Sequence, residues 1–124
     1  HVVEILTEKT PSAYRTYLRE KGVSYILAGQ EQLDCKEAVR KLRRIFGIQT
    51  LLICGGGVVN WTFMQQGVVD ELSLLLAPAA DGASSTPTVF ECMDSLTSSD
   101  PVEFVLKTIE RLQGNGVRLT YLVK

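Results

Sequence analysis

Three consecutive glycines, Gly55-Gly56-Gly57, are the residues whose type and spacing most directly indicate a chemical role. They follow the apolar run Thr50–Cys54 and precede a segment of helix length, so they stand between a predicted strand and a predicted helix. Glycines let a ligand approach the backbone closely, and a helix start directs unpaired N–H groups and the positive end of its dipole into the same space. The pattern therefore predicts a point where an anion such as a phosphate is stabilised. A tight turn without a ligand is the alternative.

The residues around the glycines exclude the two common nucleotide-binding motifs. Counted from Gly55, a Rossmann fingerprint needs glycine or alanine where Asn60 stands. A P-loop needs a glycine-lysine pair where Asn60-Trp61 stands. The glycines by themselves therefore do not identify the ligand.

The other ionisable side chains offer little catalytic chemistry. His1 is the only histidine and the first residue, which argues against a histidine-based triad, general acid or metal site. Asp70 and Glu71 resemble an acid pair suited to glycosidase work. Adjacent residues on a strand point to opposite faces, however, so we interpret this pair as structural.

Composition is typical of one soluble globular domain or part of one. The 124 residues are 45% hydrophobic and 22% charged, and no apolar run reaches the ~18 residues that span a bilayer. A net charge of −1 argues against nucleic acid or an anionic membrane as a partner. The cysteines are odd in number and lack C-x-x-C spacing, which indicates reduced thiols of a cytoplasmic protein without a metal site. They are Cys35, Cys54 and Cys92.

The first part of the chain predicts a strand, a helix and a second strand. The strands are Val2–Thr7 and Val23–Ala28. Between them, Thr10 or Ser12 can cap a helix that has Pro11 in its first turn.

A longer helix with clear end signals follows. Asp34 and Glu37 have capping-box spacing, and Gly47 stands after the last turn. Its apolar residues recur at helical spacing: Cys35, Ala38, Val39, Leu42, Ile45 and Phe46. The other face is basic, and a solvated face is favoured over a phosphate site: Lys36, Arg40, Lys41, Arg43 and Arg44.

The second part predicts a return to strands. Val68–Ala77 is apolar, and Val102–Leu112 and Val117–Val123 alternate around the turn Gln113–Gly116. Ala79–Pro87 is predicted to be a surface loop. A further loop should attach to the core through Val89-Phe90 and Leu96.

This order predicts an α/β fold of three layers, α/β/α, with a mostly parallel twisted sheet and an antiparallel C-terminal hairpin. Ligands of such sheets bind beyond the carboxyl ends of the parallel strands. Three predicted ends should converge there, Thr7–Lys9, Ala28–Gln30 and Cys54–Val58. We therefore expect a site of dinucleotide size.

The strings Leu51–Phe63 and Gly67–Pro78, with Asp81-Gly82 after them, resemble the second half of the dihydrofolate-reductase-like superfamily. They resemble most the RibD C-terminal family, riboflavin-pathway reductases that act on a phosphoribosylaminopyrimidine. The resemblance covers residues 1–124 as one domain but only about half of the family's domain, so we expect an incomplete domain. It implies an NADPH-dependent reductase that transfers a hydride to a pyrimidine- or pterin-type small molecule. It also implies a homodimer.

The resemblance assigns cofactor-binding residues. Gly55-Gly56 matches the glycine pair that receives the NADPH pyrophosphate and is joined by a cis peptide bond. Thr7 matches a hydroxyl near the adenosine 2′-phosphate, where Lys9 could add charge; a plain capped turn is the alternative for both. The helix N–H groups would come from Gly57, Val58 and Val59.

Cys54 departs from the family pattern, because riboflavin-pathway reductases usually have glutamate at this position close to the substrate. A buried thiol is a small hydrophobe and cannot replace the charge or hydrogen bonds of a carboxylate. The identity of the pyrimidine substrate is therefore not fixed by the resemblance. We name Cys54 as a substrate-side residue and no residue as catalytic. The alternative function is a non-catalytic nucleotide-binding or interaction module derived from the same fold. A flavodoxin-type domain is disfavoured by the closing hairpin.

Overall fold

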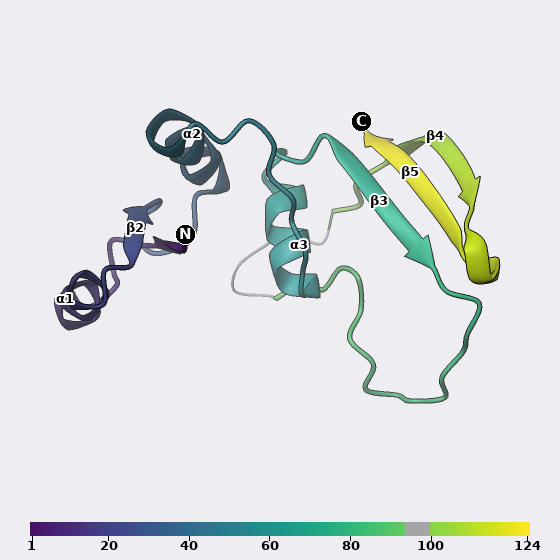
Figure 1. Ribbon diagram of the computed structural model, residues 1–124, viewed down its shortest axis with the longest axis horizontal. Helices are drawn as coiled ribbons and strands as arrows, with labels where there is room; N and C mark the ends of the chain where they lie inside the picture. Colours follow the sequence, from purple (N-terminus) through teal and green to yellow (C-terminus); the bar gives the residue numbers. More distant parts are fainter. Residues whose placement is uncertain (94–99) are drawn as a thin grey trace. The chain divides into compact units, whose positions relative to one another are not determined.

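The computed structural model describes residues 1–93 and 100–124 (Figure 1). The chain divides into two compact units, His1–Ile53 and Cys54–Lys124, and each is described by itself. The first contains a parallel strand pair with helices, and the second contains an antiparallel sheet. The α/β class is therefore confirmed.

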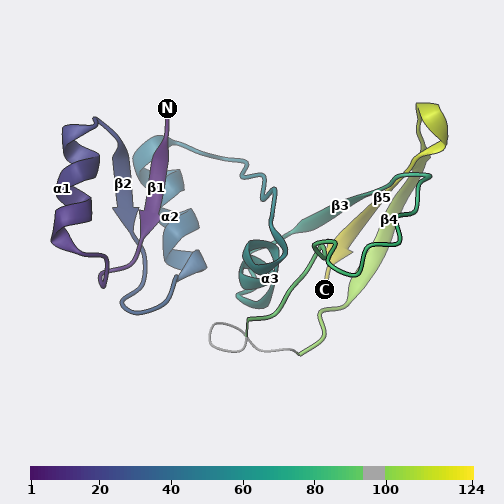
Figure 2. The same ribbon diagram turned by 90° about the horizontal axis from the view of Figure 1, so that it is seen from below.

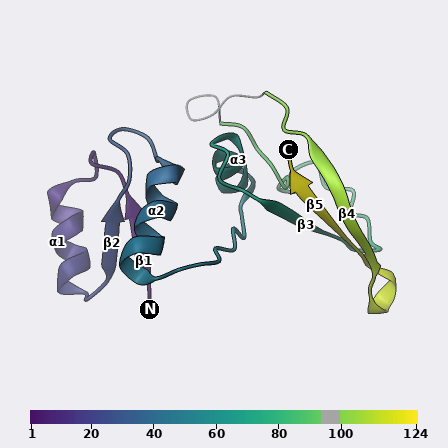
Figure 3. The same cartoon turned by 90° about the horizontal axis from the view of Figure 1, so that it is seen from above.

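The first unit runs strand, helix, strand, helix. β1 (Val3–Leu6) and β2 (Ser24–Leu27) pair in parallel, with Val3 opposite Ser24 and Leu6 opposite Leu27. α1 (Ser12–Glu20) and α2 (Cys35–Phe46) lie on opposite sides of this pair (Figures 2 and 3). Parallel strands need such a crossover connection, and α1 provides it.

The core of the first unit comes from one face of each helix and from β2. A helix whose apolar residues recur three or four apart buries one stripe against a sheet, and both helices contact β2. The buried apolar residues of this unit are Leu18, Ile26, Ala28, Cys35, Ala38 and Leu42.

The helix ends agree with the sequence in α2 and differ in α1. Asp34 is the N-cap of α2 and its side chain accepts from the Glu37 N–H, and Gly47 takes the left-handed conformation at the C-cap, as predicted. The prediction that Thr10 or Ser12 caps α1 is wrong. Pro11 is the N-cap, and no side chain caps the helix because the proline ring has no oxygen that could accept from the first helical N–H groups.

The second unit is a helix followed by a three-stranded sheet. α3 (Gly57–Gln65) precedes β3 (Glu71–Leu76), and β5 (Val117–Val123) lies between β3 and β4 (Phe104–Arg111). All neighbouring strands are antiparallel. β4 and β5 are joined by the short 3₁₀ turn η1 (Gln113–Asn115), which confirms the predicted hairpin.

Two expected details of the sheet are wrong. Residues 50–54 form no strand, and β3 pairs antiparallel with β5 rather than continuing a parallel sheet. A strand persists only where its N–H and C=O groups are paired by a neighbour, and none of the described strands pairs with this run. An apolar run of this kind is expected to be buried on both faces, but Leu52 is 81% exposed, so no neighbouring element covers its side chain.

The segment after β3 is a surface loop, as predicted, with residues 79–87 exposed. Figure 1 shows that it leaves the sheet and returns to α3. Phe90 then packs edge-on against Trp61 of α3, with ring centroids 6.1 Å apart. Leu96, the other expected anchor, lies outside the described residues.

Candidate functional site

The glycine turn before α3 presents open backbone at a helix start. The Gly55–Gly56 peptide bond is cis, as the resemblance implied, and Gly55 has φ +90°, a conformation that favours glycine. Gly56 is exposed and is the N-cap of α3, with no side-chain cap. A Cβ built on Gly56 meets nothing within 4 Å. A ligand can therefore reach the Gly56 backbone where the first helical N–H groups lack intrahelical partners.

Gly57 has a different role from its two neighbours. It is buried, and a Cβ there would lie 2.7 Å from the Thr88 carbonyl oxygen and 3.0 Å from the Glu91 Cβ. The Asn60 side chain donates to the Val89 carbonyl at 2.9 Å, which holds the same segment. The space left by the missing side chain at Gly57 is therefore filled by residues 88–91 of the same chain and is not available to a ligand.

The residues that flank the glycine turn are more accessible than expected. Cys54 is exposed, so its treatment as a buried thiol is wrong. No strand forms at residues 50–54 to enclose its side chain. Val59 is 45% exposed and Val58 is half-buried, both in the first turn of α3. Their backbone N–H groups belong to the helix start that the sequence predicted as an anion site.

In the first unit, the turn after β1 is joined to the loop after β2. Beyond the β1–β2 ladder, Glu8 N–H donates to the Gly29 carbonyl at 3.0 Å and Lys9 N–H to the Gln30 carbonyl at 3.1 Å. Thr7 is half-buried, and its carbonyl accepts from Thr10 at 3.1 Å. The two predicted strand ends in this unit, residues 7–9 and 28–30, thus lie side by side as expected.

Lys9 does not stand alone in this turn. Its Nζ lies 2.6 Å from the Glu31 Oε2, and the two side chains are 68% and 72% exposed. The pair joins residues 22 positions apart in the sequence. The positive charge that the sequence offered to a phosphate is therefore already shared with a carboxylate of the chain.

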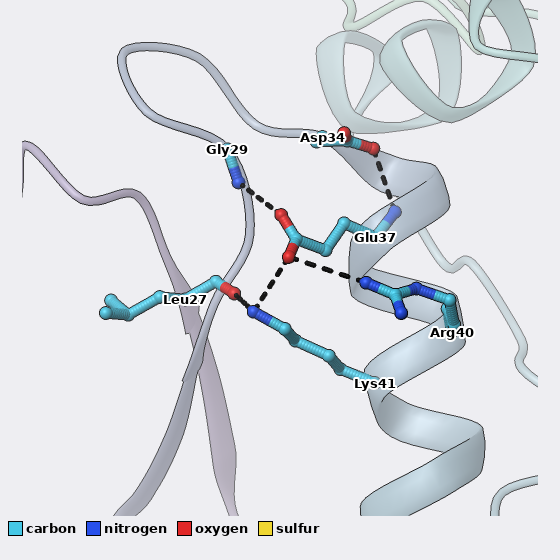
Figure 4. A network of polar contacts seen from close by, with 6 residues as sticks. All are labelled: Leu27, Gly29, Asp34, Glu37, Arg40 and Lys41. Carbon is cyan, nitrogen blue, oxygen red and sulfur yellow. Dashed lines mark hydrogen bonds and ion pairs between the residues drawn. The ribbon is translucent and has the colours of Figure 1, made fainter.

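A polar network fastens the loop after β2 to α2 (Figure 4). The Glu37 carboxylate accepts from the Gly29 N–H at 3.1 Å and pairs with the Lys41 Nζ at 2.9 Å. Lys41 also donates to the Leu27 carbonyl at 2.6 Å. The hydrogen bond from Lys41, followed by that from the Gly29 N–H, holds the pKa of the Glu37 carboxyl below its ordinary value, against the opposing effect of burial, and the charges of Lys41 and Arg40 add to the lowering.

The basic face of α2 is thus only partly a solvated face. Lys41 is half-buried and serves the network, whereas Arg40, at 64% exposure, lies 3.7 Å from the Glu37 Oε1. The remaining basic residues of this face are exposed, as expected: Lys36, Arg43 and Arg44.

Among the thiols, Cys35 is set apart by burial. Its side chain is fully enclosed, and desolvation, with the neighbouring Asp34 carboxylate, raises its pKa to about 11. A thiol with so high a pKa is neutral and unreactive at pH 7. Cys35 is therefore part of the core.

The sequence analysis missed three contacts of the first unit: the Glu37–Lys41 ion pair, the Gly29–Glu37 hydrogen bond and the Lys9–Glu31 ion pair. The Glu37–Lys41 spacing of four was a visible signal for an ion pair on a helix, but nothing indicated that Glu37 also binds Gly29. No pattern linked Glu31 to Lys9, because the two lie in different loops. The glycine turn and the Thr7–Lys9 turn belong to different units.

The described residues contain neither a metal-ligand cluster nor a membrane-crossing helix. Within residues 1–93 and 100–124, no three side chains among His, Cys, Asp and Glu gather where they could hold a metal ion. In the same ranges, no helix has the length and apolar character needed to cross a bilayer.

Comparison with protein families gives one match that spans nearly the whole chain: residues 2–117 match the RibD C-terminal domain. Over 83 residues the chain is 34% identical to the 2,5-diamino-6-ribosylamino-4(3H)-pyrimidinone 5′-phosphate reductase of Aquifex aeolicus, covering 67% of this chain and 37% of that protein. Over 119 residues it is 25% identical to the reductase of the same name from Methanothermobacter thermautotrophicus, covering 96% of this chain and 54% of the relative. The chain thus spans about half or less of these relatives.

Solved structures share the fold. A pyrimidine reductase-like protein from Corynebacterium diphtheriae matches with a TM-score of 0.79 at 21% identity, over 98% of this chain and 50% of that one. RibD from Acinetobacter baumannii matches with a TM-score of 0.70 at 24% identity, over 90% and 29%. At these identities the likeness establishes the fold.

Proposed function

Because this chain belongs to the RibD C-terminal domain family, we propose that it is part of an NADPH-dependent reductase of riboflavin biosynthesis. Its substrate would be a phosphorylated ribosylaminopyrimidine of the kind named for the Aquifex and Methanothermobacter relatives. The observation that carries the proposal is the family match over residues 2–117, together with 34% identity to a reductase over two thirds of the chain.

Two turns, one in each unit, have groups that suit a phosphate of a dinucleotide. The exposed Gly56 backbone leaves room for a pyrophosphate, and the N–H groups at the start of α3 would stabilise its charge. Thr7 and Lys9 would hold the adenosine 2′-phosphate. When bound, NADPH supplies the hydride, and the protein supplies orientation.

The substrate side is less defined by this chain. Cys54, immediately before the glycine pair, is exposed and would face the substrate if it matches the family's glutamate position. A thiol does not provide the two acceptor oxygens of a carboxylate. This difference favours the second candidate, a nucleotide-binding module without reductase activity, and the test must separate the two.

The cofactor part is tested by calorimetric titration of the whole protein with NADPH and, in parallel, with NADH. We expect saturable binding of NADPH at least about tenfold tighter than that of NADH, or ~1.4 kcal/mol. Gly56→Ala should weaken NADPH binding with little loss of stability, since its Cβ meets no atom of the protein. Gly57→Ala is the matched control: its Cβ collides with residues 88–91, so we expect a lower free energy of unfolding.

The chemical part is tested by following NADPH oxidation with 2,5-diamino-6-ribosylamino-4(3H)-pyrimidinone 5′-phosphate. Turnover that is lost in Gly56→Ala would support the reductase. NADPH binding without turnover would favour the module. No binding of either dinucleotide at millimolar concentration would refute the cofactor site.

A further inference from the structure

The loop of residues 28–32 lies beside the turn that carries Lys9. Backbone hydrogen bonds continue from the β1–β2 ladder into both segments: Ala28 N–H donates to the Leu6 carbonyl at 2.8 Å, and the bonds from Glu8 and Lys9 follow. The two segments are therefore held in register beyond the ends of their strands. Glu31 lies in this loop, one residue after the last of these bonded carbonyls.

The shape of this loop is imposed by the fold and not by the Lys9–Glu31 pair. Gly29 has φ +89°, and a Cβ there would lie 2.0 Å from the Gln32 carbonyl oxygen, so the loop closes tightly on itself. The Gly29 N–H is bound by Glu37, which is itself held by Lys41 (Figure 4). Removing the Glu31 carboxylate should therefore leave the backbone of the loop in place.

Because the backbone of the loop is fixed, the Glu31 carboxylate competes with any anion that approaches the Lys9 ammonium. The ammonium and the carboxylate are 2.6 Å apart and both are largely exposed. A phosphate monoester carries a charge of about −1.5 to −2 at pH 7, so it must displace Glu31 from Lys9 and is repelled by the freed carboxylate. A ribose hydroxyl meets no such repulsion and can donate a hydrogen bond to a carboxylate.

We propose that Glu31 limits the preference for NADPH over NADH by competing with the adenosine 2′-phosphate for Lys9. This inference rests on the proposed function, because it concerns the same cofactor site. Lys9 attracts the 2′-phosphate, Glu31 weakens that attraction, and the ratio of the two dissociation constants reports the balance.

The test compares dinucleotide affinities in matched variants of the whole protein. Calorimetry gives Kd for NADPH and NADH at low salt for the unsubstituted protein, Glu31→Gln and Glu20→Gln. Glu20 is exposed at the last turn of α1, beyond the opposite ends of the strands, so its substitution makes the same change in net charge away from the site. Lys9→Met and the double variant Lys9→Met/Glu31→Gln complete a cycle that isolates the pair.

In Glu31→Gln, we expect the ratio of Kd for NADH to Kd for NADPH to rise about threefold to fivefold, the scale of an exposed charge pair. Glu20→Gln should leave the ratio unchanged, and added salt should shrink the effect of Glu31→Gln. In the Lys9→Met background the rise should be smaller, because no ammonium remains to be released. A general change in loop structure would alter both affinities without this dependence on Lys9.

The outcomes distinguish this inference from the proposed function. NADPH binding with an unchanged ratio in Glu31→Gln overturns the role of Glu31 and leaves the cofactor site standing. An equal rise in Glu20→Gln also overturns it, because net charge alone would then explain the change. If the unsubstituted protein binds neither dinucleotide, the proposed function itself fails.

Discussion

Replacing Gly29 with alanine should lower the free energy of unfolding by about 2 to 5 kcal/mol. A side chain at φ +89° costs roughly 1–2 kcal/mol. The added Cβ would also lie 2.0 Å from the Gln32 carbonyl oxygen and 2.8 Å from the Asp34 nitrogen. Both are backbone atoms, so the loop has to open, and overpacking of this kind costs roughly 1–3 kcal/mol.

Gly47→Ala is the matched control for the strain term. Gly47 has φ +69° at the end of α2, but nothing lies within 4 Å of its added Cβ. Its loss should therefore be only the ~1–2 kcal/mol of the left-handed conformation. Urea unfolding followed by circular dichroism measures both variants against the unsubstituted protein.

The two variants should also differ in cofactor binding. Gly29→Ala displaces the loop that carries Glu31, so the ratio of NADH to NADPH dissociation constants should change, whereas Gly47→Ala should leave it as it was. Equal losses of stability in the two variants would refute the reasoning, because the collision at Gly29 would then cost nothing. An unchanged ratio in Gly29→Ala would show that the loop is not part of the cofactor site.

Four further predictions concern helix capping, thiol reactivity, pH dependence and core packing. Asp34→Ala should lower the free energy of unfolding by about 0.5–2 kcal/mol through loss of the α2 cap, while Asp34→Asn retains most of it; equal losses in urea unfolding would contradict this. Cys35, with its pKa near 11, should resist alkylation at pH 8 while the exposed Cys54 reacts, as mass spectrometry would detect. Because the folded-state pKa of Cys35 is raised, its contribution to stability is complete below about pH 9 and is lost as the pH rises through 11. The urea midpoint of the unsubstituted protein should therefore fall over this pH range relative to the midpoint of Cys35→Ala. The same pH dependence in both proteins would argue against this role. Leu42→Ala should cost about 2–5 kcal/mol in the same assay, since Leu42 is 5% exposed, and a loss below 1 kcal/mol would mean that the site collapses around the deletion.

Local signals in the sequence were sufficient for most elements of the first unit and for the hairpin of the second. The Asp34 cap, the Gly47 stop and the apolar period between them specify α2, because a helix satisfies its hydrogen bonds within one segment. The hairpin of β4 and β5 is equally local, since its turn and alternating pattern are contiguous. The family resemblance, which rests on the string around the glycines, was confirmed by the match over residues 2–117.

Strand formation at residues 50–54 could not be decided in this way. The run has the composition of a buried strand, but a strand depends on partners that lie elsewhere in the sequence. The described strands do not pair with it. The antiparallel pairing of β3 with β5 joins segments about 45 residues apart, so local pattern carried no information on its direction.

The sequence by itself thus determined the family, the α/β class, the helix ends of α2 and the glycine turn, because these reside in contiguous residues. Tertiary structure alone decided what each of those residues meets. It placed residues 88–91 against Gly57, left Gly56 open, and brought Glu31 onto Lys9 across two loops. Such contacts depend on how separate segments pack, and the spacing of residues along the chain does not encode them.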